Sequence, residues 1–360
     1  MLQLSRKKEA GGIVGLDIEA DSIAAAEVVS NGSVKVKAAA VAPLDPGTFR
    51  DGEVIDGESL AKALKSLFTE HKLSKRVRVG IGNQRVVVRT LRLPAIEDQK
   101  EMDAAVRFQA QEQIPMPLEE AAFEHQVVGG VAATEESSAQ VDVMVVAARR
   151  DTISSFLEPV RRAGLEPAGI DLSAFGMIRA LAGVAAEPTD AATAPDQEAV
   201  LYCNLGDVMN LAVARDRGCL FTRVSTMGLE TISGRLVADR GLTPEHASMW
   251  LIHVGLEAPV EEIEGDPETV AEVRRLLEGG VFGLVDELRL SRDHYAAQEG
   301  AVPVGRIVLC GPGSAIPGLA AQIQAGLGLP VSSVRPPALS GFDGSTAARL
   351  TLPYGLALES

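Results

Sequence analysis

The stretch GLDIEADSIAAAEV, residues 15–28, carries Asp17, Glu19 and Ser22 close together around a short polar turn. An apolar strand before the turn and an apolar return strand after it give the frame of a phosphate-binding hairpin. Two features depart from such a site. Glu19 adds charge where a phosphate favours glycine, and the return strand through Ala24–Ala26 has no lysine. These residues leave open whether the hairpin binds a nucleotide or only keeps the shape of a site that did.

Other side chains offer no competing chemistry. The sequence contains no GxxxxGK[ST], HExxH, GxSxG or CxxC signature, so common enzyme classes have no support. Cys203, Cys219 and Cys310 each stand alone in apolar runs, which predicts buried thiols in a reducing compartment. His246 and His253 share a helical face, but no third ligand completes a metal site, so core or surface roles are favoured.

Composition narrows the choice of partner. A net charge of -15 argues against nucleic acid, because neutralising phosphates requires clustered lysine and arginine. The basic patch Arg6–Lys8 reads as a solvated tail, with contact to an anionic membrane as the alternative. No apolar run approaches the roughly 20 residues of a membrane span, so we expect a cytoplasmic protein. A length of 360 residues favours two domains or several subdomains.

The first half alternates strands and helices. Strand patterns fill residues 13–41, and an amphipathic helix is predicted for 59–70. Residues 86–150 show a different pattern of polar and apolar residues. A polar-faced helix there ends at the IPMP segment, and two strand patterns follow. This block is predicted to be a small inserted α+β subdomain. The composition of residues 185–198 is that of a linker.

The second half repeats the opening of the first. An apolar strand at 200–205 leads into a polar turn and a return strand, and a helical block follows at about 228–300. A further strand at 306–310 leads into the loop GPGSAIPG. Such a repeat indicates an internal duplication whose two turns face one cleft.

Several segments in this order resemble one family, the PilM proteins of type IV pilus assembly. The similarity covers nearly the whole chain from Ile13, and its order and spacing are more specific than any single motif. The segments are GLDIEADSIAAAEV, RFQAQEQIPMPLEEAAFEHQVV, LFTR, VDELRLSRDHYAAQ and RIVLCGPGSAIPGLAAQI. The resemblance implies an α/β, actin/Hsp70-like two-domain fold with an inserted 1C subdomain, as in FtsA.

The implied subdomains divide the chain as follows. Subdomain 1A takes residues 13–85, completed by 151–185 and 341–360, and 1C takes 86–150. Subdomain 2A takes 199–227, completed by 302–340, and 2B takes 228–301.

The resemblance also implies a nucleotide site for ATP and Mg²⁺. Asp17 matches the acid that holds Mg²⁺ through water, while Glu19 and Ala24 replace the usual glycine and lysine. Asn204 stands where the second loop usually has aspartate, and Pro312 replaces a glycine of the third. The implied cofactor-binding residues are Asp17, Ser22, Asn204, Gly206, Asp207, Gly311, Gly313 and Ser314, with Glu287 and Ser291 on the adenosine side.

The charges in the first loop predict a low affinity for ATP. Two unit charges about 4 Å apart interact by about 4 kcal/mol at an effective dielectric of 20. Glu19 beside a triphosphate opposes binding by up to that amount, and the missing lysine removes an attraction of similar order. We therefore expect weak ATP binding and doubt hydrolysis.

The expected function is that of a cytoplasmic scaffold, peripheral to the inner membrane, in a type IV pilus assembly complex. In the family, a groove between the first domain and the inserted subdomain binds the short N-terminal tail of PilN, a bitopic membrane protein, and here residues 86–150 and their neighbours are expected to line it. Ile114, Met116 and Leu118 are predicted to offer an apolar surface to that tail. Arg223, after the second loop, is predicted to support structure without contacting phosphate.

Three alternatives remain open: an active ATPase of pilus assembly, a sugar or metabolite kinase of the same superfold, and an FtsA-like filament protein. The altered loops argue against the first two. Against the third, no amphipathic helix follows Leu358.

Overall fold

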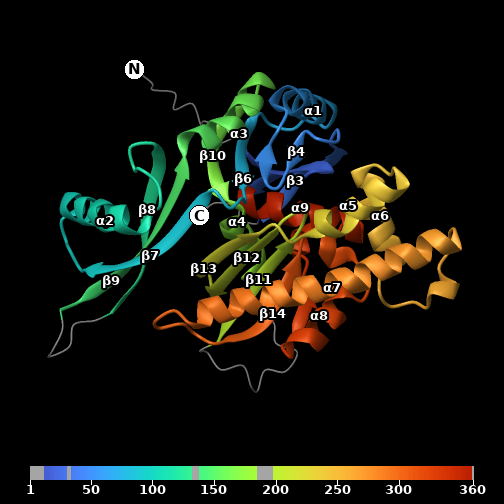
Figure 1. The fold of residues 1–360 in the computed structure, drawn as a ribbon. Coiled ribbons are helices and arrows are strands. Elements are labelled where there is room, and N and C mark those ends of the chain that lie inside the picture. Colours follow the sequence, from blue (N-terminus) through green and yellow to red (C-terminus); the bar gives the residue numbers. More distant parts are fainter. Residues whose placement is uncertain (1–11, 31–33, 132–137, 185–197, 359–360) are drawn as a thin grey trace.

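The chain contains two five-stranded sheets of the same topology. The structure, a computed structural model, describes residues 12–30, 34–131, 138–184 and 198–358 (Figure 1). The proposed linker at 185–198 and the basic patch therefore lie outside the described residues, except for Glu198. Each sheet is an antiparallel three-strand meander extended by two parallel strands, which is the duplication predicted from the sequence.

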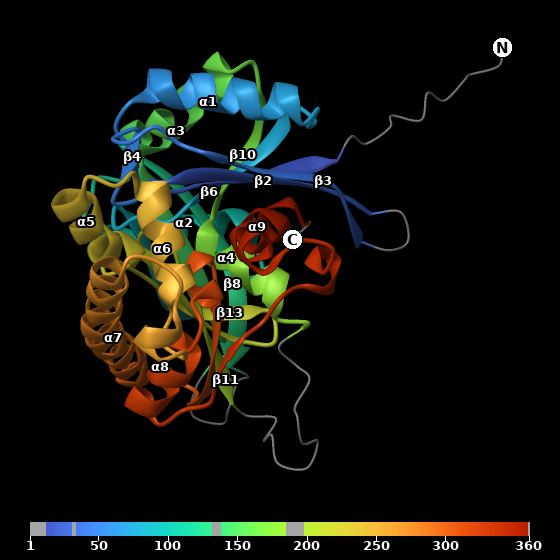
Figure 2. The same ribbon diagram turned by 90° about the vertical axis from the view of Figure 1, so that its right-hand side faces the viewer.

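The first sheet has the strand order β10-β6-β1-β2-β3. Its strands are β1 (Ile13–Ile18), β2 (Ser22–Ser30), β3 (Val34–Pro43), β6 (Arg76–Ile81) and β10 (Glu166–Leu172). Helices α1 (Gly57–Glu70) and α3 (Arg150–Arg162) cover one face (Figure 2). There, alternate β1 residues such as Leu16 pack in one apolar cluster with Leu64 and Phe156. A short ribbon, β4 (Phe49–Arg50) with β5 (Glu53–Val54), precedes α1.

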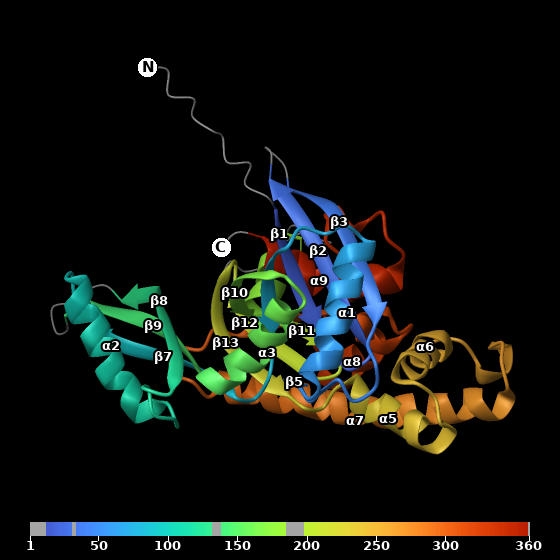
Figure 3. The ribbon, with the colours of Figure 1, turned by 90° about the horizontal axis from the view of Figure 1, so that it is seen from above.

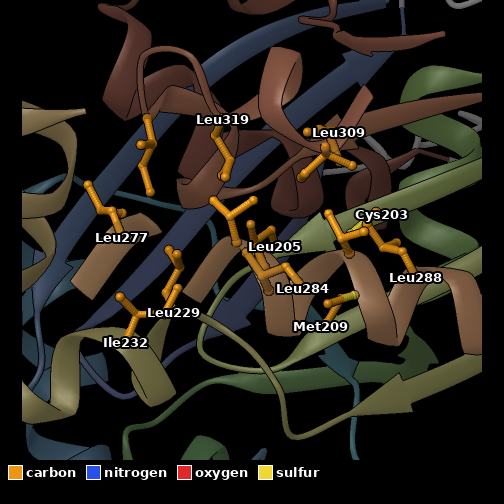
Figure 4. Packing of buried hydrophobic residues seen from close by; sticks show 14 of the residues in the cluster. Cys203, Leu205, Met209, Leu229, Ile232, Leu277, Leu284, Leu288, Leu309 and Leu319 are labelled. Carbon is orange, nitrogen blue, oxygen red and sulfur yellow. The ribbon is translucent and has the colours of Figure 1, made fainter. Parts of the chain in front are cut away.

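The second sheet has the strand order β13-β12-β11-β14-β15. Its strands are β11 (Ala199–Leu205), β12 (Met209–Arg215), β13 (Gly218–Ser225), β14 (Val304–Cys310) and β15 (Val331–Ser333). Its outer face is covered by α5 (Leu229–Arg240), α6 (Pro244–Val254), α7 (Pro267–Ala296) and α8 (Leu319–Leu327). Figure 4 shows this core, in which Leu284 and Leu288 of α7 lie near Leu205 and Cys203 of β11. The apolar stripe predicted along α7 is buried.

Two helices lie between the sheets. They are α4 (Ser173–Leu181) and α9 (Gly344–Ala357). One apolar cluster joins Ala26 of the first sheet, Met177 of α4, Leu350 of α9 and Tyr202 of the second sheet. The helix α9 was not expected from the sequence, and its middle turn contains Pro353. This shared layer makes the two halves one packed unit.

The inserted block forms a separate three-stranded sheet with one helix. It contains β7 (Val86–Pro94), β8 (Ala121–Val131), β9 (Gln140–Arg149) and α2 (Gln99–Gln113), in the sheet order β7-β9-β8. Figure 3 shows it projecting from the body of the molecule. Ile114 and Leu118 are 4% and 8% exposed in its core, and Met116 is half-buried. The expectation that these side chains offer an apolar surface is therefore wrong for Ile114 and Leu118.

All three cysteines are free, buried and associated with the second sheet. Cys203 lies on β11, Cys219 on β13 and Cys310 on β14. Burial raises the pKa of the Cys219 thiol to about 12 and also raises the pKa of Cys203 and Cys310. Among the described residues, no helix combines the length and apolar run that crossing a bilayer requires.

Candidate functional site

The two polar turns predicted to share a cleft are in direct contact. The turn after β1 carries Glu19 and Ala20, and the turn after β11 carries Gly206 and Asp207. The backbone N–H of Ala20 donates a hydrogen bond to the carboxylate of Asp207. Because both turns leave the same end of equivalent strands, the duplicated topology brings them together.

The lack of a side chain at Gly206 leaves room for Glu19. A Cβ atom at position 206 would collide with the carboxyl group of Glu19. Glu19 therefore lies against the backbone of the opposite turn. The backbone of this second turn is fixed in its own half, because Leu229 N–H donates to the carbonyl oxygen of Gly206 at 2.8 Å.

An arginine that the sequence analysis missed enters the same site. Arg349 of α9 donates to the two carboxylate oxygens of Asp21 at 2.8 and 2.6 Å and to the Ser22 hydroxyl at 2.5 Å. Its side chain is 13% exposed. One small recess is lined by Arg349 and Ser22 together with Asp17, Glu19, Ala24 and Pro312. The site thus has a cation beside Ala24, which corrects the expectation that a cation is missing.

Four carboxyl groups face this guanidinium. Burial raises the pKa of Asp17 to about 7, with Arg349 opposing the rise. Burial and the neighbouring carboxylates raise the pKa of Glu19 and of Asp207 well above their usual range. Burial also acts to raise the pKa of Asp21, but hydrogen bonds from Arg349 and Ser22 outweigh it and hold that pKa below its usual range. The cluster therefore depends on Arg349 for its only strong local counter-charge among the described residues.

The third loop closes the site beneath Asn204. A Cβ atom at Gly311 would lie 2.6 Å from the Asn204 Oδ1 atom, and one at Gly313 would lie 2.5 Å from the Leu205 side chain. The Ser314 hydroxyl donates to the Gly311 carbonyl at 2.7 Å. The loop glycines are thus explained by packing, and the serine hydroxyl is bonded within its own turn.

The two predicted adenosine-side residues lie elsewhere, on α7. Glu287 forms an ion pair with Arg223 of β13 at 2.9 Å, and Ser291 is buried with its hydroxyl unpartnered. Neither side chain lines the recess between the turns. The ion pair is consistent with a structural role for Arg223, which stays a prediction.

The residues present do not fit a Mg²⁺-triphosphate in this arrangement. The space bordered by Asp17, Glu19, Asn204 and Asp207 is a cavity of about 20 Å³, enough for roughly one water molecule. Carboxyl oxygens of Glu19, Asp21 and Asp207 lie within 4.8 Å of one another, but Arg349 and the Ala20 N–H already bond the last two. A triphosphate would have to displace these contacts.

A larger groove opens on the other side of β12. Its volume is about 190 Å³, and it lies between β7 of the inserted sheet and β13 of the second sheet. Both strands are the outermost of their sheets within the described part of the chain. The lining residues are Ile81, Gly82, Asn83, Gln84, Val86, Val88, Arg89, Leu172, Ala174, Asn210, Leu211, Thr222, Arg223 and Val224.

Comparison with known proteins adds a family and a fold. The family model described as "Type IV pilus assembly protein PilM" matches residues 15–347. A solved PilM–PilN type IV pilus biogenesis complex is 25% identical with a TM-score of 0.78, covering 96% of this chain and 97% of that chain. MreB5 of Spiroplasma citri bound to ADP is 10% identical with a TM-score of 0.51, covering 96% of this chain and 95% of that one. The MamK double helical filament is 11% identical with a TM-score of 0.51, covering 94% of this chain and 97% of that chain. The fold is therefore actin-like, as expected from the sequence.

Proposed function

The chain belongs to the PilM family of type IV pilus assembly proteins, and on this premise we propose that it is a scaffold that holds the N-terminal tail of a PilN-like membrane protein. The observation that carries the proposal is the groove between β7 and β13. The structurally similar PilM protein was solved as a complex with PilN. Recruitment by that partner would place this chain on the cytoplasmic face of the inner membrane.

The groove suits an extended peptide. Two outermost strands border it, so a tail lying between them meets unpaired backbone groups of the kind used in β-strand addition. Val86 and Val88 supply apolar surface, while Gln84 and Thr222 supply polar atoms that fix orientation. We place the tail here instead of against Ile114 and Leu118, because those side chains are buried.

Calorimetry with a synthetic PilN-like tail tests the proposal. We expect Thr222→Trp, which fills the groove from the half-buried face of β13, to weaken binding by at least about tenfold. Thr90→Trp is the matched control, because Thr90 is an exposed β7 residue outside the groove lining. Equal affinity for both variants and the unchanged chain would place the tail elsewhere. Absence of binding to any PilN-like tail would reject the partner.

For nucleotide, we propose weak ATP binding and slow or absent turnover. The basis is the contact between the two turns, together with Glu19, Asn204 and Pro312 at positions where the family usually has other residues. Equilibrium binding of ATP with and without Mg²⁺, beside a turnover assay, separates this from an active ATPase. A filament remains the alternative scaffold, and light scattering at rising protein concentration tests it.

We also propose that the subdomain boundaries follow the three sheets. Subdomains 1A and 2A would be the two five-stranded sheets, and 1C the three-stranded sheet with α2. Subdomain 2B would contain α5, α6 and most of α7. Limited proteolysis provides the test, since cuts should fall between these units.

A further inference from the structure

The contact between the two turns joins residues far apart in the chain. Ala20 and Asp207 are separated by 187 positions, and the hydrogen bond between them is buried. Glu19 lies against Gly206 beside it, so a backbone bond and a packed side chain connect the halves at one point. Phosphates held by both turns, as the sequence led us to expect, would connect the halves at this same point.

Full ionisation of every carboxyl group at this contact would force it apart, and the raised pKa values of Glu19 and Asp207 reflect burial together with this repulsion. Asp17, Glu19 and Asp21 come from the first sheet, Asp207 comes from the second, and Glu230 of α5 adds a further carboxyl group near Asp207. Like charges about 4 Å apart repel by about 4 kcal/mol at an effective dielectric of 20. Arg349 is the arginine that faces these groups, and its hydrogen bonds keep Asp21 ionised within the cluster.

The position of Arg349 is fixed by α9. This helix packs against β1 and β2 on one side and α4 on the other, so the guanidinium group is anchored independently of any ligand. Three of its N–H bonds are directed at Asp21 and Ser22. An arginine held in a two-point geometry on a carboxylate is a stronger fixed cation than a single lysine.

We propose that Arg349 and the Ala20–Asp207 contact form an internal clamp that takes the place of Mg²⁺-nucleotide in joining the two halves of the molecule. The closed cleft is then a permanent feature of this chain and not a nucleotide-dependent state. This inference is independent of the proposed tail binding, which is measured at a different groove, and it deepens the proposal of weak ATP binding, which rests on the same contact.

Hydrogen–deuterium exchange of the peptides that cover the two turns tests the clamp. Without nucleotide, we expect slow exchange of the Ala20 amide in the unchanged protein, with less than about a twofold change on adding millimolar Mg·ATP. Arg349→Gln should accelerate exchange at both turns by at least about tenfold, because the carboxyl cluster loses its counter-charge. Arg289→Gln, at an exposed arginine of α7, is the matched control and should leave both turns unchanged.

Two results would overturn the clamp. One is rapid exchange at the turns that Mg·ATP suppresses several-fold, which would make the nucleotide the connecting element. The other is an Arg349→Gln variant whose amides at the two turns exchange at the same rate as those of the unchanged protein. If Arg349→Gln does not fold, Asp21→Asn removes the same ion pair with a smaller change, and the nucleotide comparison on the unchanged protein decides independently.

Discussion

At the residue scale, the site has an arginine from a distant part of the chain where the family resemblance leads one to expect a lysine at position 24. Ala24 removes the lysine that the family resemblance leads one to expect, and Arg349 supplies a cation to the same recess. The departures at Glu19 and Ala24 were visible in the sequence. Arg349 was not, because it lies 328 positions from Asp21 and nothing in its local sequence distinguishes it from a surface arginine.

Glu27, a buried glutamate outside the candidate site, gives a prediction at the residue scale. The Glu27 side chain on β2 is fully buried and bonds Lys37 at 2.7 Å and the Ser74 hydroxyl at 2.6 Å. Burial acts to raise the pKa of Glu27, but the hydrogen bonds from Lys37 and Ser74 outweigh it and lower that pKa. The ionised form is therefore favoured by folding. Its stabilisation is complete above the ordinary glutamate pKa and is lost as pH falls through the lowered value.

We expect Glu27→Gln to cost about 2 kcal/mol of unfolding free energy at neutral pH, since it removes charge-assisted hydrogen bonds from a buried site. The difference from the unchanged protein should shrink as the pH is lowered into the acid range. Urea denaturation at several pH values measures both. Glu58→Gln, which breaks an exposed helical pair with Lys62, is the control. A pH-independent difference would contradict the assignment.

At the element scale, periodicity predicted most of the structure. The stripes of α1, α7 and α8 and the strands of both meanders follow from alternation and helical spacing. The helix α9 was not predicted because a proline in a sequence indicates a helix break, although α9 continues through Pro353 to Ala357, and because burial on nearly all sides removes the amphipathic signal. The predicted partner surface at the IPMP segment failed for a related reason, since an apolar side chain in a sequence does not reveal whether core or partner covers it.

The contact between α4 and α9 gives an element-scale prediction. A Cβ atom at Gly355 would collide with the carbonyl oxygen of Gly176 and would lie 2.9 Å from the Ala180 Cβ atom. We expect Gly355→Ala to lower the unfolding free energy by about 2 kcal/mol or more, because both backbones would have to move. Gly344→Ala at the exposed start of the same helix is the control and should be near neutral. Chemical denaturation of both variants makes the comparison, and equal stabilities would show that the helices separate easily.

At the scale of the whole molecule, the sequence predicted the duplication but not how the two halves pack against each other. Two hairpins with similar patterns predicted two related sheets. The sequence could not show that α4 and α9 form a common layer between them, or that the two turns touch, because both facts depend on packing between residues in opposite halves. The groove between β7 and β13 likewise arises only when the inserted sheet meets the second sheet.

The placement of the three cysteines has a kinetic consequence. All are buried on strands of the second sheet, and the described part of the first sheet has none. Cys203 lies in the core beneath α5, α6, α7 and α8, so a thiol reagent reaches it only when that half opens, whereas Cys219 and Cys310 lie in the layer shared with α4, α9 and the first sheet. The modification rates of the individual thiols therefore distinguish opening of the second half, reported by Cys203, from separation of the two halves, reported by Cys219 and Cys310.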